Sequence, residues 1–186
     1  MQNQPNKSGT TTSGNKSANQ HKGSTPNSKL LTIPRRFNVP VEKLFEAFKT
    51  SDAIKAWWWP KDLYTDKVTW NFREGGDFFI NMKWANKKGD EGGMGGSFVE
   101  IKPNELIVMT DYFADAQGNR ITAAEAKQKG MWPETVYITF DFESRGETSG
   151  FTMSQEGIPN ELQAECTQGW SQSFDKLEKY LSGVKN

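Results

Sequence analysis

The stretch Ile54-Lys55-Ala56-Trp57-Trp58-Trp59-Pro60 places three consecutive indoles immediately before a proline. Neighbouring side chains lie about 100° apart around a helix and on opposite faces of a strand, so no single regular element buries all three indoles on one face. Proline disfavours the α region for the residue before it, which predicts a short helix ending near Trp57 or Trp58. At least one indole therefore points away from the main core. We interpret the stretch as the rim of an apolar cavity.

The alternative is that these tryptophans plug one end of an ordinary core. Large aromatic side chains dominate such cores as well, because each of them buries a large apolar area. The three indoles alone leave both interpretations open, and the rest of the chain has to supply further evidence.

The composition excludes several classes of function. The chain has 186 residues, and its 23 lysines and arginines balance 23 acidic residues, so there is no net charge to attract nucleic acid. With one cysteine, Cys166, and one histidine, His21, neither a disulfide framework nor a Cys/His zinc site can form within the folded part. A Ser-His-Asp or Cys-His catalytic arrangement is excluded for the same reason, since His21 lies in the polar N-terminal region.

The N-terminal region differs in composition from the rest of the chain. Residues 1–28 are rich in Asn, Gln, Ser, Thr, Gly and Lys and contain no aromatic side chain, so we predict a disordered tail followed by one domain at 29–186. This region has no apolar segment of a secretory signal, and no apolar run in the chain approaches the ~18 residues of a membrane span. We therefore expect a cytoplasmic protein.

The remaining patterns predict an antiparallel sheet and three helices. Apolar or alternating segments predict seven strands, at residues 29–37, 66–72, 78–84, 94–101, 106–113, 135–142 and 148–155. Pro34 cannot donate to a ladder, which favours an edge position for the first strand. Short helices are predicted at 41–48 and from about residue 52, and residues 114–133 form a lid or loop insertion with a helix-prone stretch at 122–129.

The last element is a long amphipathic helix. Its apolar side chains recur at intervals of four or three from about residue 159 onward, at Leu162, Cys166, Trp170, Phe174, Leu177 and Leu181. One strand, two short helices, six further strands and this helix predict an α+β fold in which a curved antiparallel sheet wraps around the helix.

Five short motifs in this order resemble one known family. They are Arg36-Phe-x-x-Pro40, Trp57-Trp58-x-Pro60, Glu74-Gly75-Gly76-Asp77-Phe78, Gly96-x-Phe98-Val99-Glu100-Ile101-x-Pro103, and Gly169-Trp170 with Leu177. Together they resemble the activator of heat-shock-protein ATPase homologue domain, a branch of the START-like helix-grip superfamily that includes lipid-transfer proteins. The resemblance covers about Leu31 to Leu181.

The resemblance implies a hydrophobic cavity between the sheet and the C-terminal helix. By analogy, Trp57, Trp58, Trp170 and Phe174 stand near it, whereas Trp59 and the insertion at 114–132 depart from the family pattern. The eukaryotic chaperone activator carries an additional N-terminal domain, and the extension here is too short and too polar to be one. The family name is therefore no direct statement of function.

The function expected is binding of a small hydrophobic or aromatic ligand, such as a lipid, without catalysis and without a cofactor. The candidate ligand-binding residues are Trp57, Trp58, Trp59, Met82, Trp84, Phe113, Met131, Trp132, Trp170 and Phe174. The alternative is a co-chaperone or protein-interaction module that stimulates a heat-shock chaperone ATPase, with a role in stress response. Exposed apolar area inside a cleft favours the first function, and exposed area on the outer sheet face favours the second.

Few polar side chains offer chemistry beside these residues. Asp111, Tyr112 and Glu134 are the only ones expected near the insertion, and nothing in their spacing indicates a catalytic group. Cys166 falls on the apolar stripe of the last helix, where a free thiol behaves as a small hydrophobic side chain. The methionines are equally suited to an adaptable cavity wall and to filling gaps in a core.

Overall fold

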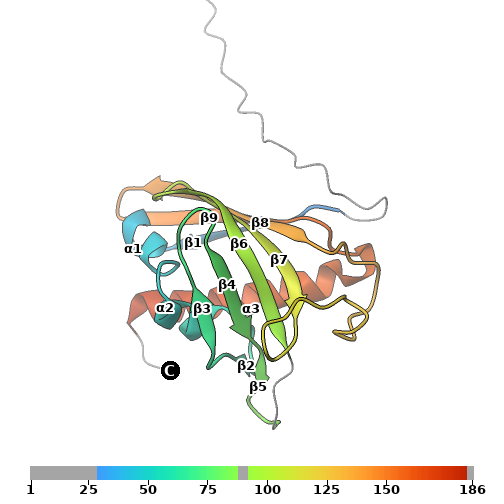
Figure 1. Cartoon of the computed structure of the whole chain (residues 1–186). Helices are drawn as coiled ribbons and strands as arrows, with labels where there is room; N and C mark the ends of the chain where they lie inside the picture. Colours follow the sequence, from blue (N-terminus) through green and yellow to red (C-terminus); the bar gives the residue numbers. More distant parts are fainter. Residues whose placement is uncertain (1–28, 88–91, 184–186) are drawn as a thin grey trace, which may run out of the picture.

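A seven-stranded antiparallel sheet forms the frame of the computed structural model, which describes residues 29–87 and 92–183 (Figure 1). The strand order is β1-β9-β8-β7-β6-β4-β3, and a separate pair joins β2 to β5. The predictions made for residues 1–28 lie outside the described residues. The strands are β1 (Leu31–Phe37), β2 (Leu63–Tyr64), β3 (Val68–Trp70), β4 (Asp77–Asn81), β5 (Lys83–Trp84), β6 (Gly93–Lys102), β7 (Leu106–Ala114), β8 (Val136–Arg145) and β9 (Thr148–Gln155).

Two short helices follow β1, as predicted: α1 (Val41–Glu46) and α2 (Ser51–Trp57). The Thr50 side chain caps α2 by accepting a hydrogen bond from the backbone N–H of Ala53 at 3.2 Å. The helix ends at Trp57, within the range that the Trp-Pro pattern predicts. Each of the three indoles therefore leaves the backbone at or beyond the end of a helix.

The long helix α3 (Gln163–Ser182) follows a 3-10 turn, η1 (Asn160–Leu162), and crosses one face of the sheet (Figure 1). Phe174, Leu177 and Leu181 are buried on its inner side, as the apolar stripe predicts. The ring of Phe174 lies 4.9 Å from that of Phe151 on β9, measured between centroids. The main core therefore fills the space between α3, α1, α2 and the sheet, which makes the fold a helix-grip α+β fold.

The first strand lies at an edge of the sheet, as Pro34 predicts. β1 pairs only with β9 in the strand order, and Pro34 stands opposite Thr152. The predicted strand at 78–84 is instead divided between two sheets. The break follows Asn81, whose buried side chain bonds the loop before β3: its Oδ1 accepts hydrogen bonds from the Thr65 hydroxyl at 2.6 Å and from the Lys67 N–H at 3.0 Å.

The helix-prone stretch at 122–129 forms turns rather than a helix. It begins with a capping arrangement, in which Thr122 and Glu125 exchange backbone-to-side-chain hydrogen bonds of 2.8 and 3.2 Å. Lys127 then adopts a left-handed backbone conformation with φ of 56°, which an α-helix cannot continue through. Residues 115–135, the β7–β8 segment from here on, therefore form a compact connection built of turns.

Candidate functional site

The three consecutive tryptophans diverge, as their spacing predicts. Trp57 is fully buried in the core, where its indole N–H donates to the Ala47 carbonyl at 3.0 Å. Trp58 is 2% exposed, and its N–H donates to the Met94 sulfur at 3.0 Å. Trp59 is only partly buried and donates to the Asn81 carbonyl at 2.7 Å. Trp57 thus packs inside the core and Trp59 forms part of a cavity wall, and Trp58 lies between them.

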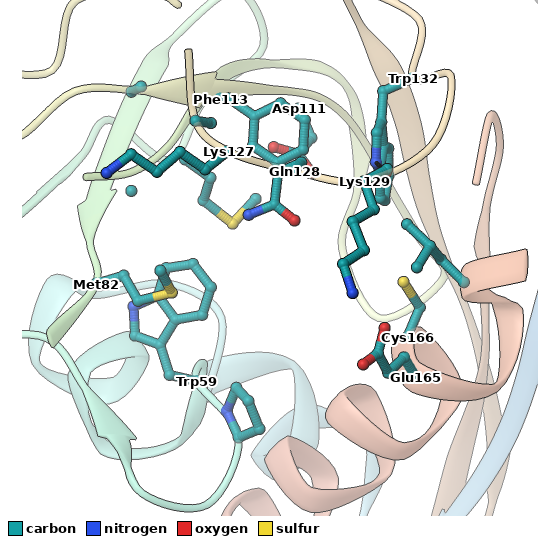
Figure 2. Close-up of a pocket in the computed structure, with 16 residues that line it drawn as sticks. Trp59, Met82, Asp111, Phe113, Lys127, Gln128, Lys129, Trp132, Glu165 and Cys166 are labelled. Carbon is teal, nitrogen blue, oxygen red and sulfur yellow. Dashed lines mark hydrogen bonds between the residues drawn. The ribbon is translucent and has the colours of Figure 1, made fainter. Parts of the chain in front are cut away.

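The main cavity lies between β7, α3 and the β7–β8 segment and has a volume of about 500 Å³ (Figure 2). Trp59 and Met82 form one side of it, Phe113 and Trp132 the opposite side, and Cys166 a third. Its full lining is Trp59, Pro60, Met82, Gly93, Met94, Asp111, Phe113, Ala114, Ala126, Lys127, Gln128, Lys129, Trp132, Leu162, Glu165 and Cys166. A volume of this size is typical of small-molecule sites.

A smaller cavity of about 190 Å³ adjoins the main cavity. The two share five lining residues, which are Trp59, Pro60, Met94, Asp111 and Cys166. Trp58, Gln155, Gly169, Trp170 and Ser173 complete the smaller one. Trp170 is held there by a hydrogen bond of 2.8 Å from its indole N–H to the Gln155 side-chain oxygen. The smaller cavity therefore extends the main one toward the aromatic core.

The β7–β8 segment also borders a third hollow of about 560 Å³, which is lined by Phe113 and residues of the segment itself, including Met131 and Trp132. Trp132 lines both this hollow and the main cavity, and its ring meets that of Phe113 edge to face at 5.3 Å between centroids. The two ends of the segment are tied together by Arg120, which donates to the Glu134 carbonyl at 2.6 Å and to the Thr135 hydroxyl at 2.7 Å.

The sequence-predicted site residues fall into two groups. Seven of the ten line at least one of the three cavities: Trp58, Trp59, Met82, Phe113, Met131, Trp132 and Trp170. Met131 reaches only the third hollow and is 78% exposed. Trp57, Trp84 and Phe174 line none of these cavities. Trp57 and Phe174 are buried in the core, and Trp84 lies on β5 with the Lys87 ammonium 4.7 Å from its ring centroid.

Asp111 is the acidic side chain that both adjoining cavities share. Its side chain is partly buried, and this burial raises the pKa of its carboxyl to about 7. Among the described residues, no hydrogen bond or ion pair compensates for the burial of this carboxylate. An ionisable group with a perturbed pKa in a cleft is a candidate functional group.

Cys166 contributes an apolar surface rather than a reactive thiol. Burial, aided by the charge of the adjacent Glu165, raises the pKa of the Cys166 thiol to about 11. The thiolate is therefore scarce at neutral pH, which agrees with the expectation from the sequence.

The lining residues that sequence reasoning missed are mostly small or charged, and include Pro60, Met94, Lys127, Lys129 and Glu165. Asp111, which also lines the cavity, has a detectable signal in the sequence. On β7, Ile107, Met109, Asp111 and Phe113 occupy alternate positions and share one face, so the period-two pattern places Asp111 among core-facing side chains. Lys127 and Lys129 have no such sequence signal, because they lie in a segment without a regular period.

Comparison with known proteins identifies the family. The profile described as activator of Hsp90 ATPase homolog 1-like protein matches residues 38–182. The chain belongs to this family. The match includes α1, α2, the strands from β2 to β9 and α3, and so confirms the resemblance that the five sequence motifs indicate.

Solved bacterial structures share the fold of this chain. A Chromobacterium violaceum protein is 24% identical with a TM-score of 0.67, and the alignment covers 84% of this chain and 98% of that one. An Arthrobacter aurescens protein is 16% identical with a TM-score of 0.70, over 84% of this chain and 88% of that one. A Silicibacter pomeroyi protein of the same family is 20% identical with a TM-score of 0.67, over 84% and 100%.

A search of curated proteins gives no match. In the described part of this activator-like chain, none of the helices has the length and apolar character needed to cross a membrane.

Proposed function

We propose that this activator-like domain binds a small, largely apolar molecule in the two adjoining cavities, without catalysis. The proposal rests on the two adjoining cavities, which have volumes of about 500 and 190 Å³. Their walls include Trp58, Trp59, Trp132 and Trp170. Aromatic walls with a few polar groups are the usual composition of a small-molecule site. We place the protein in the cytoplasm, where such a ligand would be a metabolite or a lipid.

The alternative, a co-chaperone or protein-interaction module, requires a continuous apolar surface. The exposed large apolar side chains of the described residues are Leu30, Tyr64, Val99, Met131 and Tyr180. They lie on different parts of the fold: before β1, on β2, on β6, in the β7–β8 segment and on α3. Singly scattered apolar side chains are normal on a protein surface, so this distribution favours the cavity over the surface as the binding site.

Filling the cavity tests the proposal. Cys166 lines both cavities from α3, so a phenyl ring in Cys166→Phe occupies space that a ligand needs. Saturable binding of the fluorescent probe N-phenyl-1-naphthylamine to the wild-type protein should therefore be weakened about tenfold or more in this variant. The probe is uncharged at neutral pH and becomes brighter in apolar surroundings, so a fluorescence titration measures it directly.

Two control variants separate cavity filling from other effects. Ala164→Phe places the same ring on an exposed position of α3, and Cys166→Ser removes the thiol without filling space. Both should retain wild-type affinity for the probe. If the wild-type protein shows no saturable binding, or if Cys166→Phe binds as well as Ala164→Phe does, the cavity is not the binding site and the proposal is wrong.

A further inference from the structure

Binding of an apolar ligand does not explain why Asp111 lies in the site. Asp111 is partly buried and has no hydrogen-bond or ion-pair partner among the described residues. Partial loss of water around an unpartnered carboxylate costs free energy, and an apolar side chain of similar size would avoid that cost. Burial is the sole cause of the raised pKa of Asp111, so no positive group of the described residues offsets its charge. The group is therefore better accounted for by a partner from outside the protein than by a contribution to the core.

The surroundings of Asp111 are suited to a cation. In the smaller cavity this carboxylate shares the lining with three indoles, those of Trp58, Trp59 and Trp170. The face of an indole carries the negative end of the ring quadrupole and attracts an ammonium group within about 6 Å of the ring. A carboxylate and three indoles around one small cavity together offer a counter-ion and aromatic rings suited to cation–π contacts.

The positive side chains that line the main cavity are Lys127 and Lys129. Lys127 and Lys129 belong to the β7–β8 segment, and Figure 2 shows the Lys129 side chain running toward the part of α3 that carries Glu165 and Cys166. Asp111 lies on the strand side, beside Phe113. Neither lysine forms an ion pair with Asp111. Asp111 is the only charged residue in the lining of the smaller cavity, so it is the only charged group that a negatively charged ligand would meet there.

We infer that the ligand is an organic cation, with an aromatic or aliphatic body in the apolar cavities and one basic nitrogen that pairs with Asp111. The inference rests on the proposed function, because it specifies the chemistry of a ligand in the same cavities. The protonated nitrogen donates hydrogen bonds to the carboxylate oxygens, and the body contacts the indoles of Trp58, Trp59 and Trp170.

Three probes that share one ring system test this inference. They are 2-(1-naphthyl)ethylamine, 2-(1-naphthyl)ethanol and 1-naphthylacetic acid, which present a cation, a neutral group and an anion. Calorimetric titration of the full chain at about pH 8.5, where the amine is protonated and Asp111 is ionised, should give an affinity for the amine about tenfold or more above that for the alcohol. The acid should bind least well.

The isosteric variant Asp111→Asn assigns the preference to this side chain. It removes the charge but retains the shape, so the ratio of the affinities for the amine and the alcohol should fall to about one. At about pH 5.5, where the wild-type carboxyl is protonated, the amine should lose its advantage in the same way, and Asp111→Asn should show no such change. Lys127, Lys129 and Glu165, which also line the cavity, are common to both proteins.

The outcomes are distinguishable. Binding of the alcohol without a preference for the amine overturns the inference and leaves the proposed function intact, and so does a preference that Asp111→Asn retains. Tightest binding of the acid assigns specificity to the lysines and also overturns it. Failure of all three probes to bind contradicts the proposed function together with the inference. The comparison of probes on the wild-type protein decides even if the variant does not fold.

Discussion

At the scale of single residues, Asp111 makes stability depend on pH. Burial raises the pKa of this carboxyl from 3.8 to about 7, so the folded protein binds a proton more tightly than the unfolded chain does. Stability linked to the group is therefore fully present below about pH 4 and is lost as pH rises to about 7. The loss is on the order of 2–4 kcal/mol in the free energy of unfolding.

The variant Asp111→Asn isolates this contribution. Urea unfolding of the variant and of the wild-type protein, measured from about pH 4 to about pH 8, should give a difference that grows in favour of the variant as pH rises. Asp141→Asn, on the exposed side of β8, serves as the control because its side chain is in solvent. A variant less stable than the wild-type protein at about pH 8 would contradict the unpaired state of Asp111.

The residue scale also shows what the sequence predicts about the site. The adjacency of Trp57, Trp58 and Trp59 predicts that their indoles diverge, because backbone geometry alone requires it. Which indole reaches the cavity depends on where α2 ends and on the partners Ala47, Met94 and Asn81, and these come from distant parts of the chain. Seven of the ten predicted site residues therefore line a cavity, while Trp57 lies in the core.

At the scale of elements, α3 positions the turn that carries Trp59 and Pro60. The Lys176 ammonium donates to the Pro60 carbonyl at 3.0 Å and to the Leu63 carbonyl at 2.7 Å. Gln172, one turn earlier on the helix, accepts a hydrogen bond of 3.1 Å from the Lys61 N–H. Two side chains of the helix thus hold the backbone that follows the tryptophans.

Removing the ammonium should loosen this wall of the cavity. In Lys176→Met the apolar stem is retained but two carbonyls lose their donor, so we expect a loss of about 1–3 kcal/mol in the free energy of unfolding. The affinity for N-phenyl-1-naphthylamine should also fall, since Trp59 and Pro60 line both cavities. Lys179→Met, at an exposed position of α3, is the matched control and should change neither quantity. Equal behaviour of the two variants in urea and dye titrations would contradict this role.

The elements themselves differ in how far the sequence predicts them. The stripe from Leu162 to Leu181 predicts α3 because its period persists over many turns. The stretch 122–129 has helix-favouring residues, yet Lys127 in the left-handed region ends its single turn. Intrinsic preferences of about 1 kcal/mol or less per residue are easily overridden by tertiary contacts, such as the hydrogen bond from the Arg120 side chain to the Glu134 carbonyl that ties the ends of the segment.

At the scale of the whole molecule, we expect residues 29–186 to fold as one domain. The buried apolar core extends from Leu31 to Leu181, and the composition of residues 1–28 provides nothing to bury. A fragment beginning at Lys29 should therefore unfold within about 2 °C of the full chain in a thermal melt followed by circular dichroism. Truncation after Gly169 should prevent folding, because Phe174, Leu177 and Leu181 would be lost from the core. A large drop in the first case, or a cooperative melt in the second, would contradict the domain boundary.

The overall plan was the most predictable level. The seven strands of the main sheet, the two short helices and the terminal helix follow from periodicity, whereas the short β2–β5 pair was not predicted. The volume and the walls of the cavities do not follow from periodicity, because they depend on how the β7–β8 segment folds back over Phe113 and Met94. That segment has no regular period, so its contacts are determined by tertiary packing rather than by local pattern.

Among the described residues, β1 and β3 form the two edges of the sheet, and each is poorly suited to pairing with another chain. At one edge, β1 contains Pro34, whose nitrogen has no hydrogen to donate to an added strand. At the other edge, β3 is only three residues long. Short or proline-interrupted edges resist edge-to-edge aggregation. In the part of the chain that the structure describes, neither edge therefore offers a long, uninterrupted strand on which copies of the chain could polymerise into fibrils.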